Sequence, residues 1–131
     1  MASTSAPRPV STRLIVGSLA IDAVLVVVFA AIGRASHDES VFPGLAITAW
    51  PFLAGLALGW LLTRGWLAPT APLRTGLPVW AVTLAGGMLL RAVSGQGVAI
   101  AFIIVAGMVL FAFLVGWRGI AALIARRRAS R

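Results

Sequence analysis

Between Leu14 and Gly33 the chain runs for twenty apolar or small residues that contain one charged side chain, Asp22. A helix of this length reaches ~30 Å, which matches the hydrocarbon thickness of a bilayer. A carboxylate at such depth costs about 2.5 to 3.5 kcal/mol on insertion scales. The stretch therefore predicts a membrane-spanning helix whose acid must face other helices, be protonated or find a partner.

Three further apolar stretches have similar length: Leu45–Thr63, Gly76–Val93 and Val98–Trp117. Only 11% of the 131 residues are charged, whereas a soluble domain uses roughly a quarter. Too little polar material remains to cover four such helices in water. We therefore predict an all-α fold, an integral membrane bundle of four transmembrane helices over about 14–33, 45–63, 76–93 and 98–117. Its short connections favour antiparallel neighbours.

The distribution of arginine predicts the orientation of this bundle. Residues 1–13 form an expected disordered cytoplasmic tail, 14–117 the transmembrane domain, and 118–131 a basic cytoplasmic tail that begins as a helix. With both termini inside, the outer ends hold only Arg34 and Arg91. The inner segments hold the other nine arginines: Arg8, Arg13, Arg64, Arg74, Arg118, Arg126, Arg127, Arg128 and Arg131. This bias predicts an N-in, C-in topology.

Composition and motifs narrow the classes of function. The net charge of +8 is accounted for by the positive-inside bias, so nucleic-acid binding is not expected. The chain has no cysteine, which excludes disulfides and thiolate chemistry. It lacks the common nucleotide-binding, zinc-protease and serine-hydrolase motifs. An enzyme is accordingly the less favoured reading, and neither a cofactor nor a metal is expected.

Asp22 is the sharpest candidate for a functional residue. It could form a substrate, ion or proton site, or it could make a structural hydrogen bond to Thr48, Thr83 or a backbone carbonyl. Arg91, near the outer end of the third span, could pair with Asp22 or could extend toward the outer interface as an anchor. The spacing slightly disfavours a pair between Asp22 and Arg91, because Asp22 is expected to lie several ångströms deeper than Arg91 reaches.

A polar patch follows the first span and contains Arg34, His37, Asp38 and Glu39. A solvated loop is the slightly favoured interpretation. The alternative is the mouth of a proton-handling site above Asp22, because imidazole titrates near neutral pH. A metal site is disfavoured, since adjacent residues do not converge on one ion. The candidate polar site thus comprises five residues: Asp22, Arg34, His37, Thr48 and Arg91.

Glycines predict close helix packing. Gly55 and Gly59 form a GxxxG pattern in the second span, and Gly86 and Gly87 expose the backbone of the third. Small residues let membrane helices approach closely. Packing within one chain is favoured over a dimer face.

These residues together resemble a known family. Asp22, Gly33-Arg34 with His37, Trp50-Pro51-Phe52, Gly86-Gly87 with Arg91, and Gly116-Trp117-Arg118 are similar to the small bacterial and archaeal membrane proteins known as domain of unknown function 3054. The resemblance covers about residues 12–118. It implies a four-helix membrane protein of unassigned activity and supplies no catalytic or binding residues.

Three functions follow as hypotheses. The first is a small transporter-like or ion- and proton-handling protein of a prokaryotic plasma membrane, with a water-filled cavity reaching Asp22. The second is a structural or accessory subunit, with a dry bundle and a hydrogen-bonded Asp22. The third is an enzyme for a lipid or quinone-like substrate, with a lateral groove beside Arg91 and His37. The expected partners are the lipid bilayer and a further copy or another membrane subunit.

Overall fold

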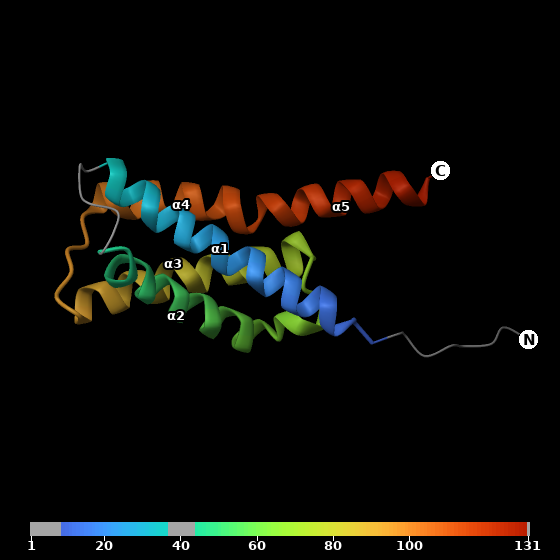
Figure 1. Ribbon diagram of the computed structural model, residues 1–131, viewed down its shortest axis with the longest axis horizontal. Coiled ribbons are helices and arrows are strands. Elements are labelled where there is room, and N and C mark those ends of the chain that lie inside the picture. Colours follow the sequence, from blue (N-terminus) through green and yellow to red (C-terminus); the bar gives the residue numbers. More distant parts are fainter. Residues whose placement is uncertain (1–8, 37–43, 131) are drawn as a thin grey trace, which may run out of the picture.

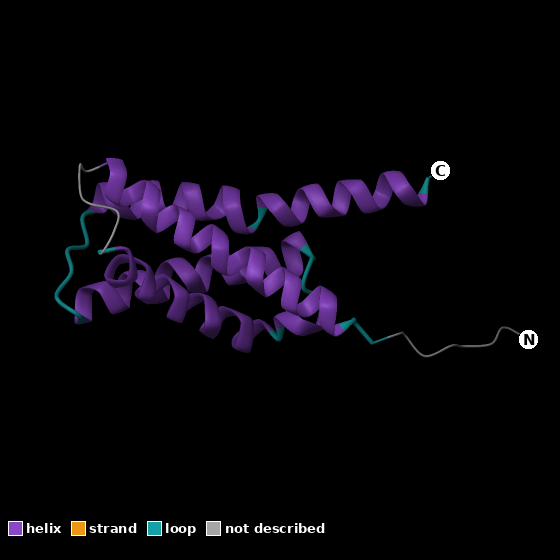
Figure 2. Cartoon of the chain, in the orientation of Figure 1, coloured by secondary structure: helices purple, strands orange, loops and turns teal. Residues whose placement is uncertain are grey.

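The structure, a computed structural model, describes residues 9–36 and 44–130, and these residues form helices joined by turns, without strands (Figures 1 and 2). The helices are α1 (Thr12–Ser36), α2 (Leu45–Thr63), α3 (Leu77–Val93), α4 (Ile100–Leu114) and α5 (Gly116–Ala129). A 3₁₀ turn (Gly65–Leu67) and a five-residue π-helical turn (Pro72–Gly76) fill the connection between α2 and α3. The predicted all-α class is confirmed.

Four helical stretches of the described residues are long and apolar enough to cross a membrane: Thr12–Ala35, Leu45–Thr63, Pro72–Val93 and Ile100–Ala129. The second coincides with the predicted span. The first is longer than predicted at both ends, and the fourth continues well beyond Trp117. Large apolar side chains cover the outside of these helices, as at Leu62 and Ile100, which are 66% and 77% exposed. Such an exterior suits a lipid environment.

The fourth stretch is almost one continuous helix. Val115, between α4 and α5, keeps helical backbone angles (φ −85°, ψ −39°), and the amide of Gly119 donates to the carbonyl of Val115. α5 then extends past the rest of the bundle (Figure 1). Arg118, which the arginine count assigns to the cytoplasmic tail, is instead fully buried. That assignment was wrong for Arg118, because the residue belongs to the packed part of this helix.

The two ends of the bundle differ in their connections. We call the end that holds Ser36, Leu45, Val93 and Ile100 the Arg91 end, and the opposite end the Arg118 end. At the Arg118 end, the connection 64–76 folds on itself through side-chain hydrogen bonds. Thr75 Oγ1 donates to the carbonyl of Ala68 at 2.6 Å, and this hydroxyl is fully buried. The connection 64–76 is therefore an ordered segment at the Arg118 end of the bundle.

Glycines bring α2 and α3 together, and these two helices share the most extensive contact in the chain. A Cβ atom built on Gly55 would lie 2.9 Å from the carbonyl oxygen of Thr83, and one on Gly86 would lie 3.3 Å from the Cα of Gly55. Gly59 faces the backbone of Val79 in the same way, and Gly87 faces the ring of Phe52. The four predicted packing glycines thus lie at one contact inside the chain.

An aromatic cluster fills the bundle toward the Arg91 end. Phe29 of α1 meets Phe52 of α2 edge-to-face with ring centroids 5.1 Å apart, and Phe102 of α4 lies 6.3 Å from both. Such edge-to-face pairs add to the stabilisation from burial. Toward the Arg118 end, Leu110, Leu114 and Val79 are fully buried. The apolar core therefore leads directly into the polar cluster described next.

Candidate functional site

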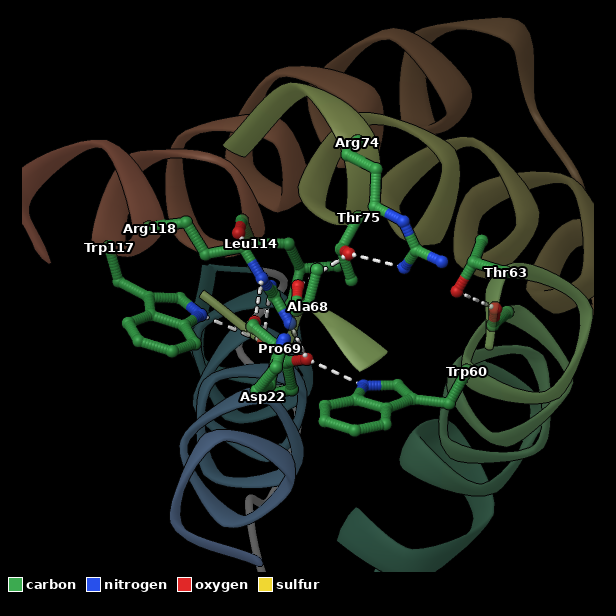
Figure 3. A network of polar contacts seen from close by, with 11 residues as sticks. Asp22, Trp60, Thr63, Ala68, Pro69, Arg74, Thr75, Leu114, Trp117 and Arg118 are labelled. Carbon is green, nitrogen blue, oxygen red and sulfur yellow. Dashed lines mark hydrogen bonds and ion pairs between the residues drawn. The ribbon is translucent and has the colours of Figure 1, made fainter. Parts of the chain in front are cut away.

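Asp22 lies in a buried polar cluster at the Arg118 end of the bundle (Figure 3). Its partner is Arg118, whose two terminal nitrogens donate to Oδ1 at 2.8 Å and to Oδ2 at 2.6 Å. Both side chains are fully buried. This bidentate geometry pairs two N–H groups of the guanidinium with the two carboxylate oxygens, and it gives the strongest type of hydrogen-bonded ion pair.

Two tryptophans complete the environment of the carboxylate. Trp60 of α2 donates its indole N–H to Oδ2 at 2.8 Å, and Trp117 donates to Oδ1 at 2.8 Å (Figure 3). Each carboxylate oxygen thus accepts two hydrogen bonds. A carboxylate offers about four such acceptor positions, so the protein itself fills the hydrogen-bonding capacity of Asp22.

Backbone carbonyls and an aromatic ring hold Arg118. Its Nε donates to the carbonyl of Pro69 at 2.8 Å, and NH1 donates to the carbonyl of Leu114, also at 2.8 Å. The guanidinium carbon lies 4.8 Å from the centre of the Trp117 ring. The cluster consequently ties together α1, α2, the junction of α4 with α5, and the connection 64–76.

The cluster corrects the predicted partners of Asp22. Thr48 accepts a hydrogen bond from Arg34 at 3.0 Å, at the other end of the bundle. Thr83 is buried against α2 near Gly55, and its hydroxyl has no hydrogen-bond partner among the described residues. Arg91 donates to the side chain of Gln96 and to the carbonyl of Gly97. None of these three residues bonds to Asp22 within the described part of the chain.

The contacts of Asp22 therefore differ from those expected of a residue that lines a polar path for an ion or a proton. A substrate or transported ion would have to displace a bond from Arg118, Trp60 or Trp117 to reach the carboxylate. The chemistry of the cluster is that of a buried, fully bonded ion pair, which fixes the relative positions of the helices.

A second candidate lies at the Arg91 end, where a cavity of about 400 Å³ opens between all four helical stretches. Its polar lining includes Arg34 from α1, Thr48 from α2, Arg91 from α3, and Gln96 from the following turn. The guanidinium of Arg91 also lies 4.6 Å from the centre of the Phe102 ring. The structure therefore brings Arg34, Thr48 and Arg91 around one cavity and leaves Asp22 outside its lining.

Short local contacts position the two arginines of this cavity. Arg34 stands in the last turn of α1, where a cation complements the helix dipole, and it donates to Thr48. Arg91 stands in the last turn of α3 and holds the turn that follows, with 2.8 Å from NH2 to the carbonyl of Gly97. Gly95 in that turn has φ +82°, a value that favours glycine.

An apolar groove of about 380 Å³ adjoins the cavity between α1 and α4. The two hollows share part of their lining: Phe29, Gly33, Ala99 and Phe102. The remainder of the groove is aliphatic: Ile32, Ala101, Val105 and Val109. His37, which the sequence placed in the candidate polar site, lies outside the described residues, as do Asp38 and Glu39.

Sequence reasoning missed Arg118, Trp60, Trp117 and the carbonyl of Pro69. Arg118 could have been identified as the partner of Asp22 by comparing how far each residue lies from the helix end at the same side of the bundle. At ~1.5 Å per residue, Asp22 lies about 21 Å from the Ser36 end of α1, and Arg118 about 27 Å from the Ile100 end of α4. The Ser36 end of α1 and the Ile100 end of α4 both lie at the Arg91 end of the bundle, so these residues fall at similar levels.

The chain matches a family of proteins of unknown function, DUF3054, over residues 19–121. This match covers most of the chain and includes every residue whose side chain belongs to the ion-pair cluster. No curated protein and no solved structure matches the chain. The chain belongs to this family, as the pattern of residues predicted.

Proposed function

We propose that this member of the DUF3054 family is a multi-pass protein of a prokaryotic plasma membrane that binds an anionic group in the cavity between Arg34 and Arg91. The observation that carries the proposal is the convergence of these two arginines, from different helices, on one cavity of about 400 Å³. Cavities of this size commonly hold small ligands with a few polar groups at fixed positions.

The chemistry of the lining supports an anion. Guanidinium groups present planar forks of N–H donors that match phosphate and carboxylate oxygens. Thr48 and Gln96 add a hydroxyl and an amide beside them. The preferred ligand therefore carries a phosphate or carboxylate.

The Asp22–Arg118 cluster has a different part in this proposal. Its four hydrogen bonds to the carboxylate support a structural role that stabilises the bundle around the cavity. We assign no transport of ions or protons to Asp22. The function is binding, with no catalytic group assigned.

The first experiment measures binding of methyl phosphate to the detergent-solubilised protein, using the ³¹P line width of the ligand. We expect broadening with the wild-type chain and weaker binding with Arg34→Gln and Arg91→Gln. Each change removes hydrogen bonds to a charged group worth about 1.5 to 3 kcal/mol, which is roughly tenfold or more in Kd. The matched control is Arg126→Gln, which removes the same charge from an exposed position on α5 and should bind like the wild type.

Two outcomes would overturn the anion site. Equal losses in Arg126→Gln and Arg91→Gln would indicate nonspecific attraction to a basic protein. Absence of binding in the wild type, with binding gained in Asp38→Asn combined with Glu39→Gln, would mean that the chain's own acids supply the counter-charge. In that case the cavity would have no external ligand, and a structural or accessory function would be preferred.

The proposed orientation places both termini in the cytoplasm and the Arg91 end outside. With the buried Arg118 left out of the count, eight arginines fall at the inner side and two, Arg34 and Arg91, at the outer side. Ser94 and Ser130 are exposed at opposite ends of the chain's helices, and the protein has no natural cysteine. In intact cells, a membrane-impermeant thiol reagent should label Ser94→Cys and leave Ser130→Cys unlabelled. After cell lysis both variants should react, and the reverse pattern in intact cells would contradict the topology.

A further inference from the structure

The cavity between Arg34 and Arg91 does not end at its polar lining. The α1–α4 groove begins at the residues that the two hollows share, and four of its lining residues belong to both: Phe29, Gly33, Ala99 and Phe102. A Cβ atom built on Gly33 would meet nothing within 4 Å. Space therefore remains beside this glycine, which lines both the cavity and the groove.

The groove itself suits a hydrocarbon chain. Its aliphatic part is contributed by Ile32 of α1 and by Ala101, Val105 and Val109 of α4. Ile32 and Val105 are 51% and 56% exposed, so the groove opens on the apolar exterior of the bundle. Phe102 joins the two regions, since one face of its ring lies 4.6 Å from the guanidinium of Arg91 while its side chain also lines the groove.

We propose that the ligand is an anionic amphiphile whose head lies between Arg34 and Arg91 and whose alkyl chain lies in the α1–α4 groove. This inference rests on the proposed function and names the class of its ligand. The two arginines and the aliphatic α1–α4 groove adjoin each other. An alkyl phosphate or a fatty acid likewise joins an anionic head directly to an alkyl chain. A small hydrophilic anion would leave the groove unused.

The α1–α4 groove is expected to fix the position of the alkyl chain rather than to increase the affinity for the ligand. Because the chain of an amphiphile is already in an apolar medium in a micelle or bilayer, burial from water supplies little additional affinity. Contacts with Ile32, Ala101 and Val105 would instead hold the chain in one place. The informative measurement is therefore where the chain lies.

The experiment uses dodecyl phosphate that carries a diazirine in the middle of its chain, added to the full-length protein in detergent. After illumination, the crosslinked peptides are identified by mass spectrometry. We expect labelling concentrated on α1 around Ile32 and on α4 around Ala101 and Val105. An excess of unlabelled dodecyl phosphate should reduce this labelling at least tenfold, and Arg91→Gln should reduce it similarly.

A groove variant and its control separate this inference from the proposed function. Ala101→Trp fills the groove at an exposed position, and Leu62→Trp adds the same side chain to an exposed site on α2 that lines neither hollow. Ala101→Trp should lower labelling of α1 and α4 at least fivefold while methyl phosphate still binds. Leu62→Trp should alter neither measurement.

Two results would overturn the placement of the chain. Labelling spread evenly over all exposed helices, or labelling of the groove that persists in Ala101→Trp, would remove the groove from the site. If methyl phosphate still binds through Arg34 and Arg91, the proposed function survives that result. Absence of methyl phosphate binding to the wild-type protein would overturn the proposed function itself. Phosphatidic acid, added as a second competitor, tests whether two-chain lipids share the site, and its competition at the same peptides would support the proposed class.

Discussion

Replacement of Arg118 by glutamine is expected to lower the free energy of unfolding by about 3 to 5 kcal/mol, because it leaves the carboxylate of Asp22 buried without its cation. The change also removes the donors to the carbonyls of Pro69 and Leu114. Arg118→Lys should lower the free energy of unfolding by less, since it keeps the charge but loses the bidentate contact. Unfolding in mixed micelles, followed by tryptophan fluorescence, measures these differences.

A double-mutant cycle identifies the partner of Asp22. Asp22→Asn alone leaves a buried guanidinium uncompensated and should also destabilise strongly, whereas Asp22→Asn with Arg118→Gln should cost less than the sum of the two. We expect a coupling energy above about 1 kcal/mol. The same cycle with Arg91→Gln should give a coupling near zero, because Arg91 bonds to Gln96 and Gly97 instead. A loss below about 1 kcal/mol for Arg118→Gln would contradict the structural role of the cluster.

The helices could be predicted well because their signal is local. Each is a run of apolar residues bounded by arginine, glycine or proline, and α2 between Leu45 and Thr63 agrees with the prediction at both ends. The family assignment also followed from scattered single residues and is confirmed over residues 19–121. The fourth span was predicted to end at Trp117 and the tail to begin as a helix, and the structure continues this helix to Ala129.

The ion pair could not be read from such local patterns. Asp22 and Arg118 are 96 residues apart in the sequence, and their contact depends on how α1 packs beside α4 and α5. Arg118 was counted with the arginines of the inner face because it follows an apolar span. A buried arginine and a solvated one look alike in a sequence, and only the requirement that an intramembrane acid find a partner distinguishes them. The cavity at Arg34 and Arg91 likewise required the turn at Gly95–Gly97 to bring Gln96 beside them.

The contact between α2 and α3 gives the second large effect. Gly55→Ala is expected to lower the free energy of unfolding by about 1 to 3 kcal/mol, the usual cost of overpacking. Its new methyl group would lie 2.9 Å from the carbonyl oxygen of Thr83 and 3.1 Å from the amide nitrogen of Gly87. Both are backbone atoms of α3, so the helices would have to separate to make room. Mixed-micelle unfolding again provides the measurement.

Two other glycines of the chain serve as graded controls for Gly55. At Gly59 the nearest atoms to a new methyl group, the Cα and carbonyl oxygen of Val79, are both 3.4 Å away. Gly59→Ala should therefore cost clearly less than Gly55→Ala. At Gly17, exposed on α1, nothing lies within 4 Å, and alanine should be neutral or stabilising because it favours the helix. Equal effects of Gly55→Ala and Gly17→Ala would mean that α2 and α3 do not approach each other at Gly55, since only a close backbone contact predicts a difference between them.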